Sequence, residues 1–300
     1  MSETALTHEH IGDNAWRRFW SRGGWWKAVL LAVAYLAVYQ GLGWIIQNIF
    51  GDLIDTDNLF GSPLTIFFAL ALPILIMALL LLAFIRSMGW QGEIFGRQRV
   101  RGRAWMWVAV ALILIPTVVK LFAIKWSAYS VTVVLATLFF GLCVGLAEEL
   151  LTRGVATNLL WRAGYTERVV FVLSSLLFGL LHSVNILSGL PAITVAITVV
   201  YTFGFGAMMY LSMLATGRIV WAILLHAATD PVTFLATGGL DAHGSTSGDA
   251  GLLAIGSIFN YVYILAALIA IIFVRGRVYA DRSPGRRPER PRGEDPVVPA

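Results

Sequence analysis

Eight long apolar segments run through this chain of 300 residues, and they restrict its fold more than any other feature. They cover roughly residues 27–50, 63–85, 104–124, 130–160, 168–188, 190–214, 218–238 and 251–274. A helix that crosses the ~30 Å hydrocarbon core of a bilayer needs about 20 apolar residues. We therefore predict an all-α, polytopic membrane protein with about eight transmembrane helices, whose surroundings include the lipid bilayer.

The composition excludes the main soluble classes. Hydrophobic residues make up 58% of the chain and charged residues 13%, whereas soluble domains carry about 25% charged residues. The single cysteine, Cys143, cannot form an intrachain disulfide and is expected to pack between helices. The net charge of +5 would suggest nucleic acid in a soluble chain. Here we attribute it to loop arginines and expect no nucleic-acid partner.

The basic residues alternate between the two sides of the predicted membrane. If the N-terminus is cytoplasmic, the inner segments hold 20 of the 22 Lys and Arg residues, and only Lys120 and Lys125 fall outside. Cytoplasmic loops of membrane proteins are enriched in Lys and Arg. We therefore expect both termini in the cytoplasm and a multi-pass protein of a cell membrane, namely the bacterial cytoplasmic membrane.

The same pattern divides the chain into five parts. We predict a cytoplasmic and interfacial N-terminal segment over 1–26, followed by three transmembrane helices over 27–125. A membrane core that carries the polar residues of the spans, and is the candidate catalytic part, covers 126–240. A last transmembrane helix with its outer loop covers 241–274, and a disordered basic cytoplasmic tail covers 275–300.

Few ionisable residues lie inside the predicted spans: Lys120, Glu148, Glu149, Arg153, His182, His226 and Asp230. Such residues are costly in lipid and usually mark a site or a structural pair. Lys120 is near the outer end of its span, where its long side chain can reach the interface. The other six lie on three spans, and we predict that they form one polar site.

Helix geometry supports this grouping. His182 lies 14 residues beyond Arg168, which corresponds to a depth of roughly 21 Å. Glu148 reaches a similar depth only if its helix continues past Arg153 to Arg162. We therefore predict that Arg153 is buried and pairs with Glu149, four residues earlier. The same spacing places His226 and Asp230 on one face of their helix, and Gly141 and Gly145 form a small-residue face for close packing.

These residue types permit more than one function. A carboxylate beside an imidazole can take a proton from water, and a second histidine can stabilise an oxyanion. Two histidines and a glutamate can also bind zinc with one open position. Buried Glu, His and Asp form proton and ion relays as well, so an ion-coupled transporter is a further possibility. Any one of these residues alone is more often structural.

Three motifs carry a family resemblance. Residues 148–153 read EExxxR, residues 178–182 read FxxxH, and residues 226–230 read HxxxD. In this order and spacing they resemble the CAAX protease and bacteriocin-processing family of intramembrane endopeptidases, also called the Abi family. The resemblance covers about residues 130–240 and implies a metallo- or glutamic endopeptidase that cleaves a membrane-associated peptide or protein.

The resemblance also implies roles for the six residues. Glu148 matches the general base, acting with His182 on the attacking water, while Glu149 and Arg153 match an ion pair that positions it. His226 and Asp230 match the pair that holds the oxyanion.

One position departs from the form found in eukaryotic members, which have Asn where this chain has Asp230. An ionised carboxylate would repel an oxyanion, so we expect Asp230 to be protonated, hydrogen-bonded to His226 or bound to a metal. Zinc and metal-independent chemistry both stay open. So does a non-proteolytic interaction protein, such as an immunity factor, scaffold or regulator, that keeps the motifs.

Overall fold

The computed structural model describes residues 14–100, 102–239 and 248–278, and all regular elements within these ranges are helices. The predicted all-α fold is confirmed. The main helices are α1 (Ala15–Ser21), α2 (Trp25–Phe50), α3 (Pro63–Thr65), α4 (Leu72–Met88), α5 (Gln91–Phe95), α6 (Trp107–Ala123), α7 (Val131–Glu149), α8 (Thr157–Arg162), α9 (Glu167–Leu181), α10 (Ala192–Thr216), α11 (Ile219–Thr237) and α12 (Ala250–Phe273).

Short segments of other helix types join or extend these helices. The 3₁₀ segments are η1 (Gly51–Leu53), η3 (Ala104–Met106), η4 (Trp126–Ala128) and η6 (His182–Ser188), and the π-helical segments are η2 (Ile66–Ala71) and η5 (Leu150–Ala156). The predictions for residues 1–13, for the outer loop around Asp241 and for the tail beyond residue 278 lie outside the described residues.

Eight helices within the described ranges are long and apolar enough to cross a membrane, as predicted. They cover Trp25–Leu53, Pro63–Met88, Ala104–Ala123, Val131–Arg162, Glu167–Ser188, Ala192–Thr216, Ile219–Thr237 and Ala250–Phe273. Bulky apolar side chains on the outer helices α2, α6 and α12 are exposed, as expected for surfaces that face lipid. The orientation with both termini in the cytoplasm stays a prediction.

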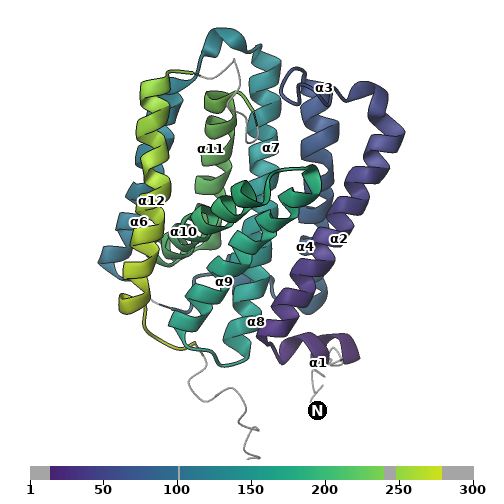
Figure 1. The fold of residues 1–300 in the computed structure, drawn as a ribbon. Coiled ribbons are helices and arrows are strands. Elements are labelled where there is room, and N and C mark those ends of the chain that lie inside the picture. Colours follow the sequence, from purple (N-terminus) through teal and green to yellow (C-terminus); the bar gives the residue numbers. More distant parts are fainter. Residues whose placement is uncertain (1–13, 101, 240–247, 279–300) are drawn as a thin grey trace, which may run out of the picture.

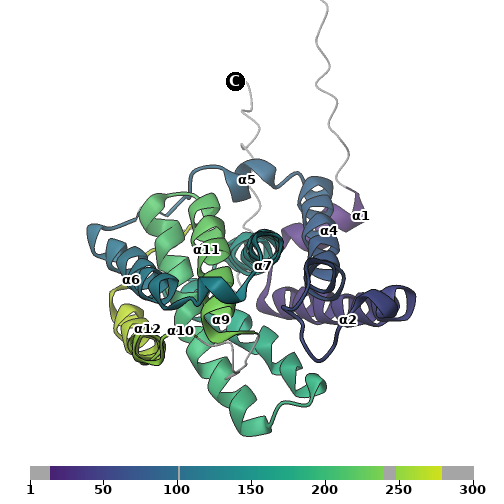
Figure 2. The same ribbon diagram turned by 90° about the horizontal axis from the view of Figure 1, so that it is seen from above.

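The longest span lies at the centre of the bundle. It begins with α7, continues through η5 and ends with α8 at Arg162, and every residue from Leu150 to Leu160 is buried. Seen from above, α7 lies between α11 and α4 (Figure 2), and further along the same span η5 and α8 pack against α2 and α9. The part of the span that follows Glu148 and Glu149 and contains Arg153 is therefore enclosed by protein.

Glycines allow α7 and α11 to approach closely. A Cβ atom at Gly145 would lie 2.7 Å from the Ile223 carbonyl oxygen, and one at Gly141 would lie 2.1 Å from Pro231 Cγ. A side chain at either position would push the two helices apart. The predicted small-residue face is thus confirmed, and its partner is the helix that carries His226 and Asp230.

Helix α10 crosses the bundle at a tilt and packs between α9 and α12 (Figure 1). A Cβ atom at Gly179 on α9 would lie 2.7 Å from the Val199 carbonyl oxygen, and one at Gly204 would lie 2.8 Å from the Ile264 nitrogen of α12. The first of these close approaches holds α9 against α10, and the second holds α10 against α12. They place His182, at the end of α9, beside the central span.

Candidate active site

Arg153 is buried in the central span, as the depth of Glu148 predicted. The helix continues past it to Arg162, and only 2% of Arg153 is exposed. Its Nη1 atom lies 3.2 Å from Glu149 Oε1, so the predicted ion pair is also confirmed. Arg153 therefore belongs to the interior of the bundle and does not contribute to a loop.

Further contacts orient the Arg153 guanidinium. Nη1 also donates to Thr152 Oγ1 at 2.7 Å, and Nη2 donates to the Gly206 carbonyl of α10. The guanidinium carbon lies 4.4 Å from the centre of the Phe178 ring, in cation–π geometry. Phe178 opens the FxxxH motif, so this contact gives that residue a physical role. One cation thereby joins the central span to α9 and α10.

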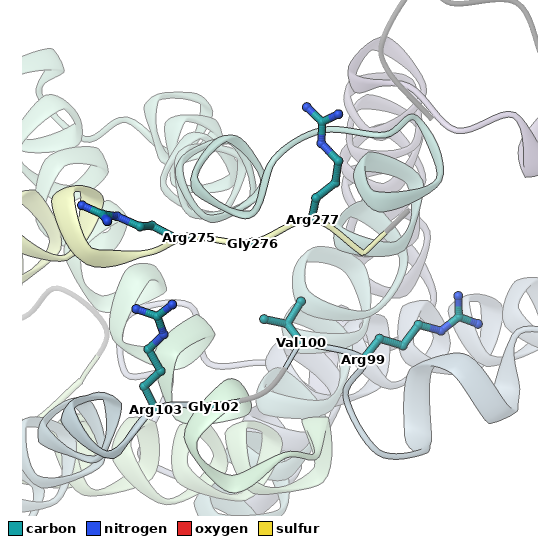
Figure 3. Close-up of a pocket in the computed structure, with 7 residues that line it drawn as sticks. All are labelled: Arg99, Val100, Gly102, Arg103, Arg275, Gly276 and Arg277. Carbon is teal, nitrogen blue, oxygen red and sulfur yellow. The ribbon is translucent and has the colours of Figure 1, made fainter. Parts of the chain in front are cut away.

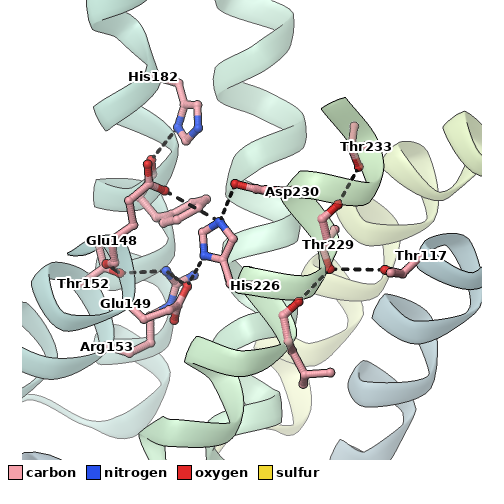
Figure 4. A network of polar contacts seen from close by, with 12 residues as sticks. Thr117, Glu148, Glu149, Thr152, Arg153, His182, His226, Thr229, Asp230 and Thr233 are labelled. Atoms are coloured by element: carbon pink, nitrogen blue, oxygen red, sulfur yellow. Dashed lines mark hydrogen bonds and ion pairs between the residues drawn. The ribbon is translucent and has the colours of Figure 1, made fainter. Parts of the chain in front are cut away.

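His226 lies between two carboxylates. Its Nδ1 atom is 2.9 Å from Glu149 Oε1, and its Nε2 atom is 3.3 Å from Asp230 Oδ2 (Figure 4). The ring is 2% exposed and is flanked by Phe178 and Phe205, whose centres lie 5.7 and 5.1 Å away. These contacts fix the orientation of the imidazole. They also confirm that His226 and Asp230 share one helix face.

The polar contacts form a continuous chain from Arg153 through Glu149 and His226 to Asp230. Glu148 lies at the edge of this chain, with Oε2 3.9 Å from His226 Nε2. The Oε2 atom is buried and makes no hydrogen bond with another described residue. The Glu148 side chain as a whole is 18% exposed, whereas that of Glu149 is fully buried. Of the two glutamates, only Glu148 is open to an incoming molecule.

His182 begins the η6 segment, where α9 ends, and it is half-buried. Its Nδ1 atom lies 3.1 Å from the Phe178 carbonyl oxygen. If Nδ1 carries the proton and donates to this carbonyl, Nε2 is left as an acceptor. Within the described residues, no ion pair or hydrogen bond joins His182 directly to Glu148. The structure therefore brings five of the six predicted residues into one contact chain and places His182 beside it (Figure 4).

Zinc binding by these residues stays a prediction. Among the described residues, no three His, Cys, Asp or Glu side chains are grouped as a metal ion requires. Both ring nitrogens of His226 face carboxylate oxygens. The chemistry proposed below uses Glu and His alone.

Sequence patterns missed several groups around the site. The Gly206 carbonyl could not be found, because a backbone acceptor on another span has no local signature. Tyr35 and Tyr39 of α2 lie within electrostatic range of Glu148, and the buried Tyr35 hydroxyl makes no hydrogen bond with a described residue. Thr152 could have been found from the sequence, because it is a polar residue immediately before Arg153 within the EExxxR motif.

The Lys120 side chain was expected to reach the membrane interface, but it contacts a neighbouring helix instead. Its Nζ atom donates to Thr233 Oγ1 of α11 at 3.2 Å, and the lysine lies within electrostatic range of Asp230. Thr229, on the same helix, also contacts Thr117 of α6 through a hydroxyl pair at 3.2 Å. The side chain stays inside the bundle because α11 offers it a hydroxyl acceptor there. Lys120 and these hydroxyls extend the polar region towards α6.

The comparison with protein families identifies the same part of the chain. Residues 130–232 match the family model described as type II CAAX prenyl endopeptidase Rce1-like. The matched segment runs from α7 into α11 and includes all six predicted site residues. The resemblance seen in the three motifs is therefore confirmed over about a third of the chain. No curated protein and no solved structure matches the chain significantly.

Proposed function

We propose that this membrane protein is an intramembrane endopeptidase that hydrolyses a peptide bond of a membrane-associated protein or peptide. The observation that carries the proposal is the position of Glu148. It is a partly accessible carboxylate at the edge of the Arg153–Glu149–His226–Asp230 chain, within the segment that matches the endopeptidase family. The cytoplasmic membrane of a bacterial cell is the location that we propose.

Glu148 is the general base in this mechanism. Its side chain is partly exposed, so the carboxylate can accept a proton from water. His182 Nε2, when its Nδ1 donates to Phe178, is a second acceptor that can orient the same water. The resulting hydroxide attacks the carbonyl carbon of the substrate, and Glu148 then passes the proton to the leaving amine.

His226 stabilises the oxyanion that this attack creates. When both ring nitrogens carry protons, Nδ1 donates to Glu149 and Nε2 donates to Asp230. The Nε2–H group lies beside Glu148 and can turn its hydrogen bond from Asp230 to the oxyanion. The Arg153–Glu149 pair keeps the imidazole oriented during this change, because Glu149 Oε1 contacts both Arg153 and His226.

The test is cleavage by the full chain reconstituted in lipid nanodiscs, measured on a library of membrane-anchored fluorogenic peptides. Glu148→Gln removes the base with little change in shape, and we expect kcat to fall about 10²–10⁴-fold. Asp57→Asn is the matched control, because it makes the same chemical change on an exposed loop residue outside the spans. Full turnover by Glu148→Gln would contradict the proposed mechanism. Absence of cleavage by the wild-type protein across the library would count against the proposed activity.

A further inference from the structure

A cavity of about 440 Å³ lies away from the candidate active site, at the ends of two membrane-spanning helices (Figure 3). Its lining residues are Arg99, Val100, Gly102, Arg103, Arg275, Gly276 and Arg277. Four of these seven are arginines, and none is acidic. The cavity therefore concentrates positive charge in a chain that has few charged residues.

The position of the cavity corresponds to the level of lipid headgroups. One wall leads through η3 into α6, and the other follows the end of α12 at Phe273. Trp105 and Phe273 pack at this end with ring centres 6.2 Å apart. Tryptophan is enriched where spanning helices meet the membrane–water interface. The arginines therefore lie next to the membrane surface.

The backbone of both walls is tied to helices that carry the candidate active site. A Cβ atom at Gly102 would lie 2.1 Å from the Leu214 carbonyl oxygen of α10, so the first wall packs directly on that helix. The Gly276 carbonyl accepts a hydrogen bond of 2.9 Å from the Glu167 nitrogen at the start of α9. The cavity thus has a framework formed by fixed backbone contacts.

The side chains supply the chemistry of a phosphate site. Arg99 extends to one side and contacts Glu93 at 3.3 Å, whereas the Arg103 side chain extends towards the segment that carries Arg275 (Figure 3). Like charges that line one cavity repel each other, and a bound anion offsets this repulsion. Guanidinium groups also bind phosphate oxygens in a bidentate manner.

We propose that this cavity binds a phosphate group, with Arg103 and Arg275 as its principal ligands. The volume falls within the ~300–1,000 Å³ range of ligand pockets. Because the cavity lies beside the spanning helices, the proposed source of the phosphate is the headgroup of an anionic phospholipid. Through Gly102 and Gly276 the bound headgroup would brace the ends of α10 and α9.

Native mass spectrometry of the purified full chain tests this proposal. Protein is exchanged into mixed micelles that contain either phosphatidylglycerol or zwitterionic phosphatidylcholine, and a third sample in phosphatidylcholine receives inorganic phosphate. The variant is Arg103→Gln/Arg275→Gln. The control is Arg86→Gln/Arg218→Gln, which removes the same charge from two exposed arginines outside the cavity.

We expect the wild-type and control proteins to retain phosphatidylglycerol, and the cavity variant to bind it at least about tenfold more weakly. Inorganic phosphate binding with the same arginine dependence would support the phosphate chemistry and assign a soluble source. Equal losses in the cavity and control variants would overturn the proposal. So would wild-type protein that retains neither anionic lipid nor phosphate. A thermal-unfolding measurement confirms that both variants are folded.

Discussion

Arg153 Nη1 lies 3.2 Å from Glu149 Oε1, and neither side chain has any exposed surface. Removing two charges from water is costly, and contacts of Glu149 Oε1 and of the two Arg153 Nη atoms with other groups offset part of that cost, although Glu149 Oε2 and Arg153 Nε make no hydrogen bond with a described residue. Glu149 Oε1 also contacts His226, and Arg153 also contacts Thr152 and Gly206. Loss of either charge would leave the other buried without its counter-ion.

The first prediction concerns this pair. We expect Glu149→Gln and Arg153→Met each to lower the free energy of unfolding by about 3–5 kcal/mol. The double variant should lose less than the sum of the two, because it leaves no unpaired charge. Unfolding in detergent micelles measures all three, with the exposed Arg168→Gln as a control expected to change stability by less than about 0.5 kcal/mol. Additive losses in the double variant would contradict this account.

The second prediction concerns Asp230. His226 Nε2 lies 3.3 Å from Asp230 Oδ2. An asparagine at this position keeps an oxygen acceptor for Nε2 and adds an N–H donor for the oxyanion. We therefore expect Asp230→Asn to cleave within about tenfold of the wild-type rate and Asp230→Ala to lose about 10²–10³-fold in kcat. Steady-state kinetics on one peptide substrate distinguishes the two variants. Equal rates for Asn and Ala would show that this position does not support the oxyanion.

The third prediction concerns the contact between α7 and α11. Gly145→Ala places a methyl group within 2.7 Å of the Ile223 carbonyl oxygen, so the helices must separate and the Glu149–His226 contact must lengthen. Gly43→Ala is the control, because nothing lies within 4 Å of its added methyl group.

We expect Gly145→Ala to cost about 1–3 kcal/mol in stability and to lower kcat. Gly43→Ala should be neutral or should stabilise α2 by up to about 1 kcal/mol. Thermal unfolding and peptide cleavage are measured on the same preparations. A fully active and stable Gly145→Ala protein would mean that the close approach of the two helices is unimportant.

The fourth prediction concerns metal dependence. The proposed mechanism uses Glu148, His182 and His226 without a metal, so activity should survive dialysis against a strong chelator to within about twofold. Elemental analysis of the dialysed protein verifies that zinc is below one-tenth of an equivalent. Loss of cleavage that zinc restores, and that other divalent ions do not, would establish a zinc enzyme instead.

Much of the site could be predicted from the sequence because its signals are local. The four-residue spacing of Glu149 and Arg153, and of His226 and Asp230, places each pair on one helix face whatever the tertiary structure. The burial of Arg153 followed from the length of its helix, because a span that ended there would have left Glu148 too shallow to approach His182.

The remaining features depend on how separate spans pack. The Gly206 carbonyl receives Arg153 only because α10 crosses the bundle at a tilt, and no residue type marks that position. Lys120 lies near the end of its span, as predicted, but its contact with Thr233 depends on the neighbouring helix. Hydropathy likewise could not distinguish the π-helical segment η5 from an ordinary α-helix, because both are equally apolar.

The segment η5 has a consequence for the length of the central span. A π-helical turn accommodates one more residue than an α-helical turn. Deleting one residue from Leu150–Ala156 would therefore let this segment close as an α-helix and leave Glu148 near its present angle relative to α8. A deletion in the α-helical part between Glu148 and Arg162 would instead rotate Glu148 by about 100°. The span of 32 residues would still be long enough to cross the bilayer, which requires about 20. Its tolerance to insertions and deletions is thus set by angular register around the helix axis, and membrane thickness places no such limit on it.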